Sequence, residues 1–301
     1  MKSKVPEIIQ WQTYIYHRSG YFLALTKPRL LLLVLITNAA GYYLALPQTF
    51  DFLMLVYVLF GTALVGGAAN TLNQWYEAIP DANMERTQNR PIPSGKLTRE
   101  QAAIFGIVLS IAGFIFLALN VNWTATFLAF LTWGIYLFIY TPMKQKTYLN
   151  TWIGAITGAL PPLIGWVAGG GQLSIEAWSL FAILFFWQLP HFFAISWLYR
   201  EDYQNGGFQM LSKGDETGDR TAFHIMFNTI VLIAVSLVPF STGQFAWIYL
   251  SSALVLGAVF FKFSFAFVQQ KNIVNVRQTF YCSIIYLPIL LLMMILDKTF
   301  L

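Results

Sequence analysis

The stretch Asn73-Gln-Trp-Tyr-Glu77-Ala-Ile-Pro-Asp81-Ala-Asn-Met-Glu85-Arg86-Thr-Gln-Asn-Arg90-Pro91 begins where the apolar run over residues 53–72 ends. A run of about 20 mostly apolar residues is long enough to cross a bilayer as a helix. The charged and amide groups of this stretch therefore lie at the end of a membrane span. Polar side chains are costly there unless they bind something. The stretch thus predicts a membrane protein with a polar site at the mouth of its helices.

The composition of the chain agrees with a membrane protein. Of its 301 residues, 57% are hydrophobic and 10% are charged, whereas a soluble domain carries about 25% charged residues. Backbone groups cannot remain unpaired in lipid and no strand-like alternation is present, so we expect helices only. The fold class is an all-α polytopic membrane protein with nine spans. The expected spans cover residues 30–46, 53–72, 102–120, 123–140, 152–168, 178–199, 222–240, 245–267 and 279–296.

Positive charge is confined to one side of the predicted bundle. Every Lys and Arg except Lys298 lies in the amino tail, or in or next to the loops that follow spans two, four, six and eight. The positive-inside rule places these segments in the cytoplasm and the carboxyl terminus outside. No removable signal or transit peptide is recognisable, which favours a bacterial cytoplasmic (inner) membrane. We predict a cytoplasmic amino tail over 1–29 and one membrane domain over 30–301. The net charge of +5 then reflects topology and no nucleic-acid binding.

Asn73, Glu77 and Asp81 are candidate metal ligands. Steps of four residues advance about 6 Å along a helix, so these side chains can share one face. Carboxylate and amide oxygens are ligands that Mg²⁺ prefers. Pro80 disfavours helix at the residue before it, so we expect the helix to end near Glu77 and Asp81 to lie on a turn. The alternative is a solvated helix end without a ligand.

Arg86 and Arg90 follow this motif with the same four-residue spacing, and Lys144 lies in the next basic loop. Arginine binds phosphate oxygens through charge-assisted, bidentate hydrogen bonds. Cations beside a carboxylate–metal site suit a diphosphate leaving group. Their alternative role is the positive charge of cytoplasmic loops.

A third polar group lies inside the sixth predicted span. Trp187, Gln188 and His191 surround Pro190, which kinks a membrane helix and releases a backbone carbonyl. A histidine within a span is a functional hypothesis by default. His191 is expected to ligate an iron, to orient a carboxylate-bearing substrate, or to form a hydrogen bond with a neighbouring helix.

Two further polar groups follow the sixth span. Arg200 and Asp202 form a second polar cluster directly after it. Asp215 and Asp219 repeat the four-residue spacing of carboxylates in a glycine-containing loop. Their spacing suits a second metal arm, and a charged cytoplasmic loop explains them equally well.

Together these motifs resemble the UbiA superfamily of intramembrane prenyltransferases and, within it, the enzymes that farnesylate haem. The resemblance covers most of the chain. It rests on Leu25-Thr26-Lys27-Pro28-Arg29, Asn73…Glu77…Asp81…Met84-Glu85-Arg86-Thr87…Asn89-Arg90-Pro91, Tyr140-Thr141…Lys144…Thr147…Asn150, Gly158-Ala159-Leu160-Pro161-Pro162-Leu163-Ile164-Gly165-Trp166, Trp187-Gln188-Leu189-Pro190-His191-Phe192 and Asp202-Tyr203.

The resemblance implies nine helices in a UbiA-type bundle around a lipid-accessible cavity. It implies that Asn73, Glu77 and Asp81 hold Mg²⁺ and farnesyl diphosphate at the cytoplasmic mouth. The farnesyl group would pass to a vinyl group of haem B, with addition of water. Further implied partners are membrane lipid and an association with haem A synthase or terminal oxidase assembly.

The block Asn73…Glu77…Asp81 marks the whole superfamily, whereas the Trp-Gln-x-Pro-His block is much more specific to the haem enzymes. The resemblance therefore points to Trp187, Gln188 and His191 as haem-binding residues. There is one departure: the stretch 198–202 lacks the upstream acid of the second carboxylate pair that other superfamily members carry. Two alternatives remain. One is a UbiA-type enzyme acting on a quinone precursor or chlorophyllide, and the other is a haem-binding membrane protein or transporter without catalysis.

Overall fold

The computed structural model describes residues 18–45 and 50–300. Within these ranges it is helical, without strands, and nine helical segments are long and apolar enough to cross a membrane. The segments are Pro28–Ala45 (α2), Phe52–Tyr76 (α3), Arg99–Asn120 (α5), Trp123–Met143 (α6, η1 and α7), Asn150–Ala168 (α8 and α9), Ile175–Leu198 (α10), Asp219–Ser241 (α12 and α13), Trp247–Gln269 (α14) and Ile273–Thr299 of α15 (Ile273–Phe300). The chain is an integral multi-pass membrane protein, as predicted. The end of the first predicted span and residues 1–17 of the amino tail lie outside the described residues.

Three of the expected continuous spans are interrupted. The seventh is divided into α12 (Asp219–Val235) and α13 (Val238–Ser241). The fourth consists of α6 (Trp123–Gly134), a π-helical segment η1 (Ile135–Tyr140) and α7 (Thr141–Met143). The fifth is divided into α8 (Asn150–Ala159) and α9 (Pro161–Ala168). The division falls at two consecutive prolines, whose missing N–H groups cannot continue the helical ladder but are tolerated in the first turn of a new helix.

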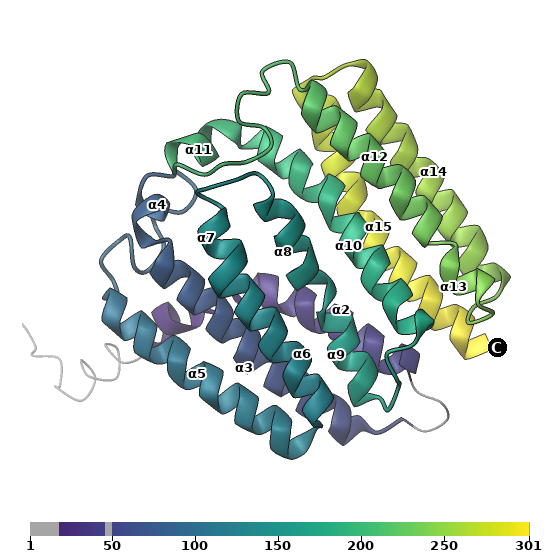
Figure 1. Cartoon of the computed structure of the whole chain (residues 1–301), viewed down its shortest axis with the longest axis horizontal. Helices are drawn as coiled ribbons and strands as arrows, with labels where there is room; N and C mark the ends of the chain where they lie inside the picture. Colours follow the sequence, from purple (N-terminus) through teal and green to yellow (C-terminus); the bar gives the residue numbers. More distant parts are fainter. Residues whose placement is uncertain (1–17, 46–49, 301) are drawn as a thin grey trace, which may run out of the picture.

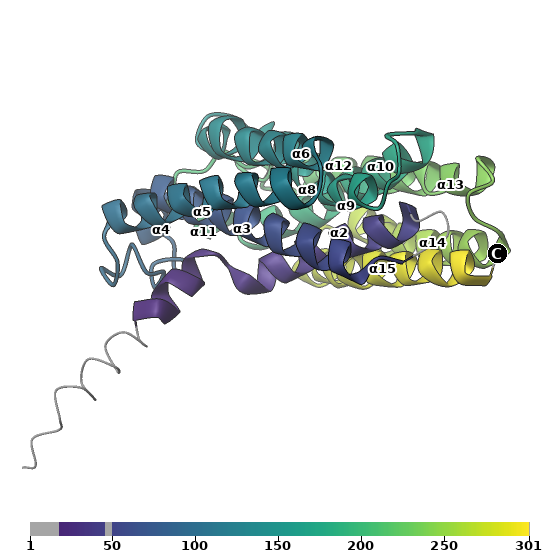
Figure 2. The same cartoon turned by 90° about the horizontal axis from the view of Figure 1, so that it is seen from below.

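The helices pack as two groups. α3 runs along α5 on one side, while α10, α12, α14 and α15 pack together on the other (Figure 1). Turned by 90°, the molecule shows α2 and α15 on one side and α6 and α12 on the other (Figure 2). α2 and α9 cross in direct backbone contact. A Cβ on Gly41 would lie 2.0 Å from the carbonyl oxygen of Pro162, and one on Gly165 would lie 1.9 Å from that of Asn38. Small residues permit such crossings in membranes.

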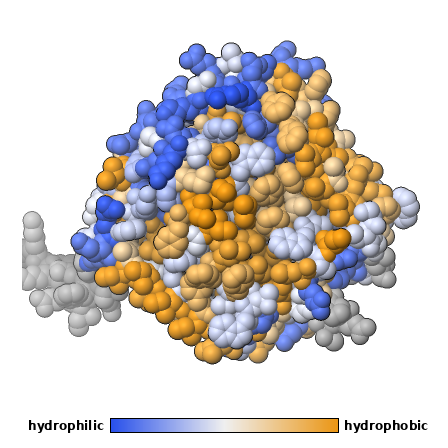
Figure 3. Space-filling model, in the orientation of Figure 1, coloured by the Kyte–Doolittle hydropathy of each residue, from blue (hydrophilic) through white to orange (hydrophobic). Residues whose placement is uncertain are grey.

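The short helices α4 (Ala78–Ala82) and α11 (Arg200–Asn205) lie at one end of the bundle together with α7 (Figure 1). Hydrophilic residues gather over this end, whereas the middle of the same face is mostly hydrophobic (Figure 3). Large apolar side chains such as Leu119 and Trp123 are 79% and 77% exposed on the outside. These exposed apolar surfaces are suited to contact with lipid.

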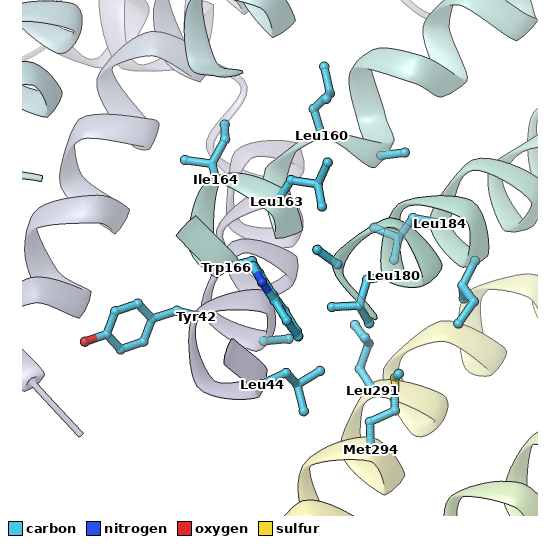
Figure 4. Packing of buried hydrophobic residues seen from close by; sticks show 14 of the residues in the cluster. Tyr42, Leu44, Leu160, Leu163, Ile164, Trp166, Leu180, Leu184, Leu291 and Met294 are labelled. Carbon is cyan, nitrogen blue, oxygen red and sulfur yellow. The ribbon is translucent and has the colours of Figure 1, made fainter. Parts of the chain in front are cut away.

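The apolar core is concentrated towards the opposite end. Leu44 of α2 and Trp166 of α9 lie near Leu180 of α10 and Met294 of α15 (Figure 4). These residues lie in the last turns of α2, α9 and α15 and in the first turns of α10. The end of the bundle that carries α4, α7 and α11 has smaller apolar clusters, one of them formed around Leu25, Ala78 and Leu97, beside its polar side chains.

Candidate active site

Asn73, Glu77 and Asp81 lie on one helical path at the polar end. Asn73 is in the last turn of α3, and the N–H of Glu77 donates to its carbonyl at 2.9 Å. The N–H of Asp81 donates to the carbonyl of Glu77 at 2.8 Å, which repeats the four-residue step. The predicted end of α3 near Glu77 is confirmed. The prediction that Asp81 lies on a turn is wrong, because Asp81 belongs to α4. Pro80 is in the first turn of that short helix, where its missing N–H removes no hydrogen bond.

Each of these three buried side chains is in contact with its own cation. Lys144 Nζ lies 2.9 Å from Glu77 Oε1, and Arg90 Nη1 lies 2.6 Å from Asp81 Oδ2. The ammonium group of Lys27 donates to Asn73 Oδ1 at 3.2 Å. Buried carboxylates are tolerated only when paired and hydrogen-bonded. The structure thus brings six side chains from four parts of the sequence into one charged centre.

Lys27 is a member of this centre that the sequence analysis did not select. Its φ of 52° lies in the left-handed region, which is uncommon for a residue other than glycine. Two amides of α3 hold the preceding carbonyls: Asn70 donates to Thr26 at 2.9 Å and Gln74 donates to Leu25 at 2.8 Å. α3 therefore fixes the turn that brings Lys27 to Asn73.

Thr141 orients the amide of Asn73. Asn73 Nδ2 donates to Thr141 Oγ1 at 3.0 Å, and Thr141 Oγ1 donates to the carbonyl of Tyr136 at 2.7 Å. The π-helical segment η1 supplies that carbonyl. Because its nitrogen is engaged, Asn73 presents its oxygen to Lys27.

Basic side chains outnumber acidic ones in this centre. Burial, together with the neighbouring charges of Arg90 and Lys144, lowers the pKa of Lys27 to about 7 against the opposing effect of the carboxylates. Burial also disfavours the charged form of Lys144, but the carboxylate of Glu77 raises the pKa of Lys144 above its ordinary value. Three basic side chains thus face two carboxylates, and an anionic ligand would favour the charged form of Lys27.

Asp202 joins the second predicted cluster to the loop after α4. Its Oδ1 accepts the backbone N–H of Glu85 at 2.8 Å, and its Oδ2 lies 3.8 Å from Arg86 Nε. The guanidinium of Arg86 also lies over the ring of Tyr203, 5.3 Å from its centroid. Arg200 instead lies over the ring of Trp197, 4.6 Å from its centroid, so the two residues of the predicted cluster have different partners.

Asp215 and Asp219 have structural partners. Asp215 accepts the N–H groups of Arg220 and Thr221 at 3.2 and 2.8 Å, and so caps the first turn of α12. Asp219 is paired with Lys271 at 2.9 Å. These contacts favour the structural interpretation of both acids.

Trp187 and His191 form hydrogen bonds with α15. Trp187 Nε1 donates to the carbonyl of Ser283 at 2.7 Å, and His191 Nδ1 lies 2.8 Å from the hydroxyl of the same serine. A hydrogen bond of His191 to a neighbouring helix, one of the expected roles, is therefore present. Gln188 donates within its own helix to Leu184 at 3.0 Å. Its amide fills the space beside Gly158, where a Cβ would lie 1.9 Å from Gln188 Oε1.

The donor set of the charged centre fits Mg²⁺. No group of three His, Cys, Asp or Glu side chains suitable for a metal occurs among the described residues. Mg²⁺, however, is usually held by one or two carboxylates and completed by water and substrate phosphates. Glu77 Oε1 is buried without a hydrogen bond and is held only by its ion pair. Glu77, Asp81 and the oxygen of Asn73 can therefore supply the protein ligands of such an ion.

Comparison with known proteins identifies similar chains of one family. The model of the UbiA prenyltransferase family matches residues 34–289. The chain is 43% identical to "Protoheme IX farnesyltransferase" of Solibacter usitatus, covering 92% of this chain and 98% of the relative. It is 35% identical to "Protoheme IX farnesyltransferase, mitochondrial" of Arabidopsis thaliana, covering 94% of this chain and 66% of the relative.

Solved structures show the same fold at lower identity. A digeranylgeranylglyceryl phosphate synthase structure superposes with a TM-score of 0.81 at 19% identity, covering 95% of this chain and all of the other. A UbiA homolog from Archaeoglobus fulgidus bound to GPP and Mg²⁺ gives a TM-score of 0.69 at 13% identity, covering 93% and 99% of the two chains.

Proposed function

The chain belongs to the UbiA prenyltransferase family, and from this premise we propose that it transfers a farnesyl group from farnesyl diphosphate to a vinyl group of protohaem IX (haem B). Addition of water would complete the product, haem O, and release diphosphate. The observation that carries the proposal is the buried centre in which Asn73, Glu77 and Asp81 each contact a separate cation. The choice of haem as acceptor is supported by the relatives named protoheme IX farnesyltransferase, which align with more than nine-tenths of the chain.

We propose that Glu77, Asp81 and Asn73 hold Mg²⁺ in this centre. When bound, the ion would supply charge neutralisation and orientation of the diphosphate. With the carboxylates so engaged, Arg90 and Lys144 can turn their donors to the diphosphate oxygens. Arg86, held by Asp202 and Tyr203 at the same end, adds a further donor. Cations positioned in advance stabilise the negative charge that develops on the leaving group.

The bond-forming step requires little from a protein base. Departure of diphosphate leaves an allylic cation on the farnesyl chain, and a vinyl carbon of the porphyrin attacks it. Water then adds to the resulting porphyrin-stabilised cation and loses a proton. Arg90 and Lys144 retain the diphosphate, while the apolar helices exclude bulk water from the cation. Trp187, Gln188 and His191 are proposed as the residues that bind haem.

The membrane orientation is also a proposal. Apart from Lys298 and Lys262, which lies within α14, the Lys and Arg residues lie in the amino tail or in the segments at the end of the bundle that carries the charged centre. The positive-inside rule therefore favours a cytoplasmic position for this end in a bacterial inner membrane, with the carboxyl terminus outside. Haem A synthase or a terminal oxidase assembly would be a fitting partner to receive so insoluble a product.

The test is turnover by the purified chain in detergent with haem B, farnesyl diphosphate and Mg²⁺, with products read by mass spectrometry. We expect a haem that has gained farnesyl plus water. Glu77→Gln combined with Asp81→Asn should abolish the product. Glu100→Gln, which changes an exposed acid at the start of α5, should leave it unchanged. Prenylation of a supplied phenolic acid, without modified haem, would instead assign the chain to the quinone branch.

A further inference from the structure

His191 is held in a defined orientation between two helices. It lies in the second half of α10, and its ring stacks with Trp187 of the same helix at a centroid distance of 5.3 Å and an interplanar angle of 22°. It also stacks with Phe280 of α15 at 5.1 Å and 30°. Two aromatic contacts and the bond to Ser283 leave the ring little rotational freedom.

The hydrogen bonds of Ser283 determine which ring nitrogen carries the proton. The hydroxyl of Ser283 donates to the carbonyl of Phe280 at 2.6 Å. A hydroxyl has only one hydrogen, so Ser283 Oγ can only accept from His191 at 2.8 Å. The proton of the neutral imidazole is therefore on Nδ1, and Nε2 carries the lone pair.

Nε2 of His191 is available to a ligand. It makes no hydrogen bond within the described part of the chain, and it is not one of the buried polar atoms that lack a partner. It therefore retains accessible surface. His224 differs, because its Nδ1 is buried without a partner among the rings of Trp152, Phe193 and Phe223.

We infer that Nε2 of His191 is an axial ligand of the haem iron, and that Ser283 is the positioning residue which holds the required tautomer. The inference rests on the proposed function, because haem B is the acceptor in that reaction. Neutral imidazole with its other N–H bonded to a protein acceptor is the usual form of a metal-ligating histidine. Such an acceptor also increases the basicity of the ligating nitrogen.

The position of His191 suits a haem, whose reacting vinyl groups lie at the edge of the macrocycle. His191 lies seven residues before the end of α10, which corresponds to about 10 Å along the helix from the polar end. That end carries the charged centre and the link between Asp202 and Arg86. A flat macrocycle anchored through its iron at this depth can extend its periphery, where the vinyl groups are, towards the polar end.

The test uses the full-length protein in detergent, titrated with haem B in the absence of farnesyl diphosphate. Absorption and electron paramagnetic resonance spectra of the ferric state, and the iron–histidine vibration of the ferrous state, report the axial ligand. We expect a histidine signature in the wild type and in His224→Ala. His191→Ala should lose it, and added imidazole should restore it.

Ser283 is tested against another fully buried serine. Ser264 of α14 is equally buried and hydrogen-bonds Thr229 at 3.0 Å, so Ser264→Ala removes a comparable bond away from His191. Removing an outer partner of a metal-bound histidine typically weakens metal affinity by about 10–100-fold. We expect that loss, with an altered iron–histidine vibration, in Ser283→Ala and not in Ser264→Ala.

Three results separate the possibilities. Haem binding with an unchanged iron spectrum in His191→Ala would overturn the assignment of the ligand, and a thiolate signature would point to Cys282 instead. Equal effects of Ser283→Ala and Ser264→Ala would overturn the role of Ser283. Absence of haem binding by the wild type would overturn the proposed function and this inference together. Turnover retained in His191→Ala would overturn the inference alone.

Discussion

Lys144→Met is the most direct test of the charged centre, because it removes one member of a buried ion pair. Glu77 is 3% exposed and its Oε1 lies 2.9 Å from Lys144 Nζ. The variant leaves that carboxylate buried without its cation. Methionine keeps a similar length and apolar stem, so the change is mainly one of charge.

The expected loss in free energy of unfolding distinguishes a buried pair from an exposed one. Removing one partner of a buried pair costs about 3–5 kcal/mol, whereas an exposed pair contributes about 0–1 kcal/mol. The burial of Glu77 places this pair in the first class. A double variant, Glu77→Gln with Lys144→Met, removes both charges and should recover most of the loss.

The pair should be insensitive to ordinary changes of pH. The pKa of Lys144 is raised above its ordinary value of 10.5 by the carboxylate of Glu77, despite burial. A raised lysine pKa contributes stability that is complete below 10.5 and is lost only as the pH rises through the folded-state value. When both proteins also carry Lys27→Met, the gap in unfolding free energy between Lys144 and Lys144→Met should therefore stay constant across about pH 6 to 9; with Lys27 present it should change, because Lys144 lowers the pKa of Lys27.

Denaturant unfolding in detergent, followed by tryptophan fluorescence, measures these free energies. Mg²⁺ should stabilise Lys144→Met more than the wild type, because in the variant the metal compensates an otherwise unpaired Glu77. A loss below about 1 kcal/mol, or no recovery in the double variant, would refute the assignment of a buried and mutually dependent pair.

Gly165→Ala should destabilise the protein by about 3 kcal/mol or more, because its Cβ would lie 1.9 Å from a backbone carbonyl of α2. Gly134→Ala meets nothing within 4 Å and should be neutral, and equal unfolding free energies of these two variants would contradict the crossing. Asp297→Ala removes the acceptor of two backbone N–H groups at the start of α14. It should cost about 1–3 kcal/mol with KM unchanged, and a raised KM would show coupling to the polar end. The pKa of Lys27, lowered from 10.5 to about 7 mainly by burial, means that the unfolded state binds more protons above pH 7. The free energy of unfolding of the metal-free protein should therefore rise by about 2 kcal/mol from pH 7 to 9, and Lys27→Met should abolish that rise; a rise that persists in the variant would assign it to other groups.

The sequence was sufficient to predict the number of spans and to predict that the residues of the acidic motif share one helical face. Long apolar runs must be helical in lipid, and a step of four residues places Asn73, Glu77 and Asp81 together whatever the tertiary structure. The local geometry at Pro80 was less predictable. Its restriction on the preceding residue suggested a turn, but Ile79 is helical, and Pro80 is accommodated because it stands in the first turn of a new helix, where its missing N–H removes no hydrogen bond.

The partners of the motif depend on tertiary packing. Lys27 reaches Asn73 across 46 positions of sequence, through a left-handed turn held by amides of α3. Its charge was indistinguishable from the positive charge of any cytoplasmic flank. Ser283 is equally remote from His191, at 92 positions, and no local pattern marks a serine within a span as an acceptor for a ring nitrogen. One span ends with three amide residues, at positions 70, 73 and 74. These amides were the feature of the sequence that could have indicated hydrogen bonds from α3 to a second segment.

Each acid of the charged centre is paired with a cation, and this pairing affects whether metal and diphosphate bind separately or together. A metal ion alone would have to displace Arg90 and Lys144 from the carboxylates and leave both cations without partners. A diphosphate alone would draw the same cations away and leave Glu77 and Asp81 unpaired in a buried site. Either exchange carries the large penalty of an isolated buried charge. When metal and diphosphate arrive together, the carboxylates take the metal and the cations take the phosphates, so no charge is left unpaired. The contacts in this structure therefore favour binding of a metal–diphosphate complex over binding of the metal ion alone or of the diphosphate alone.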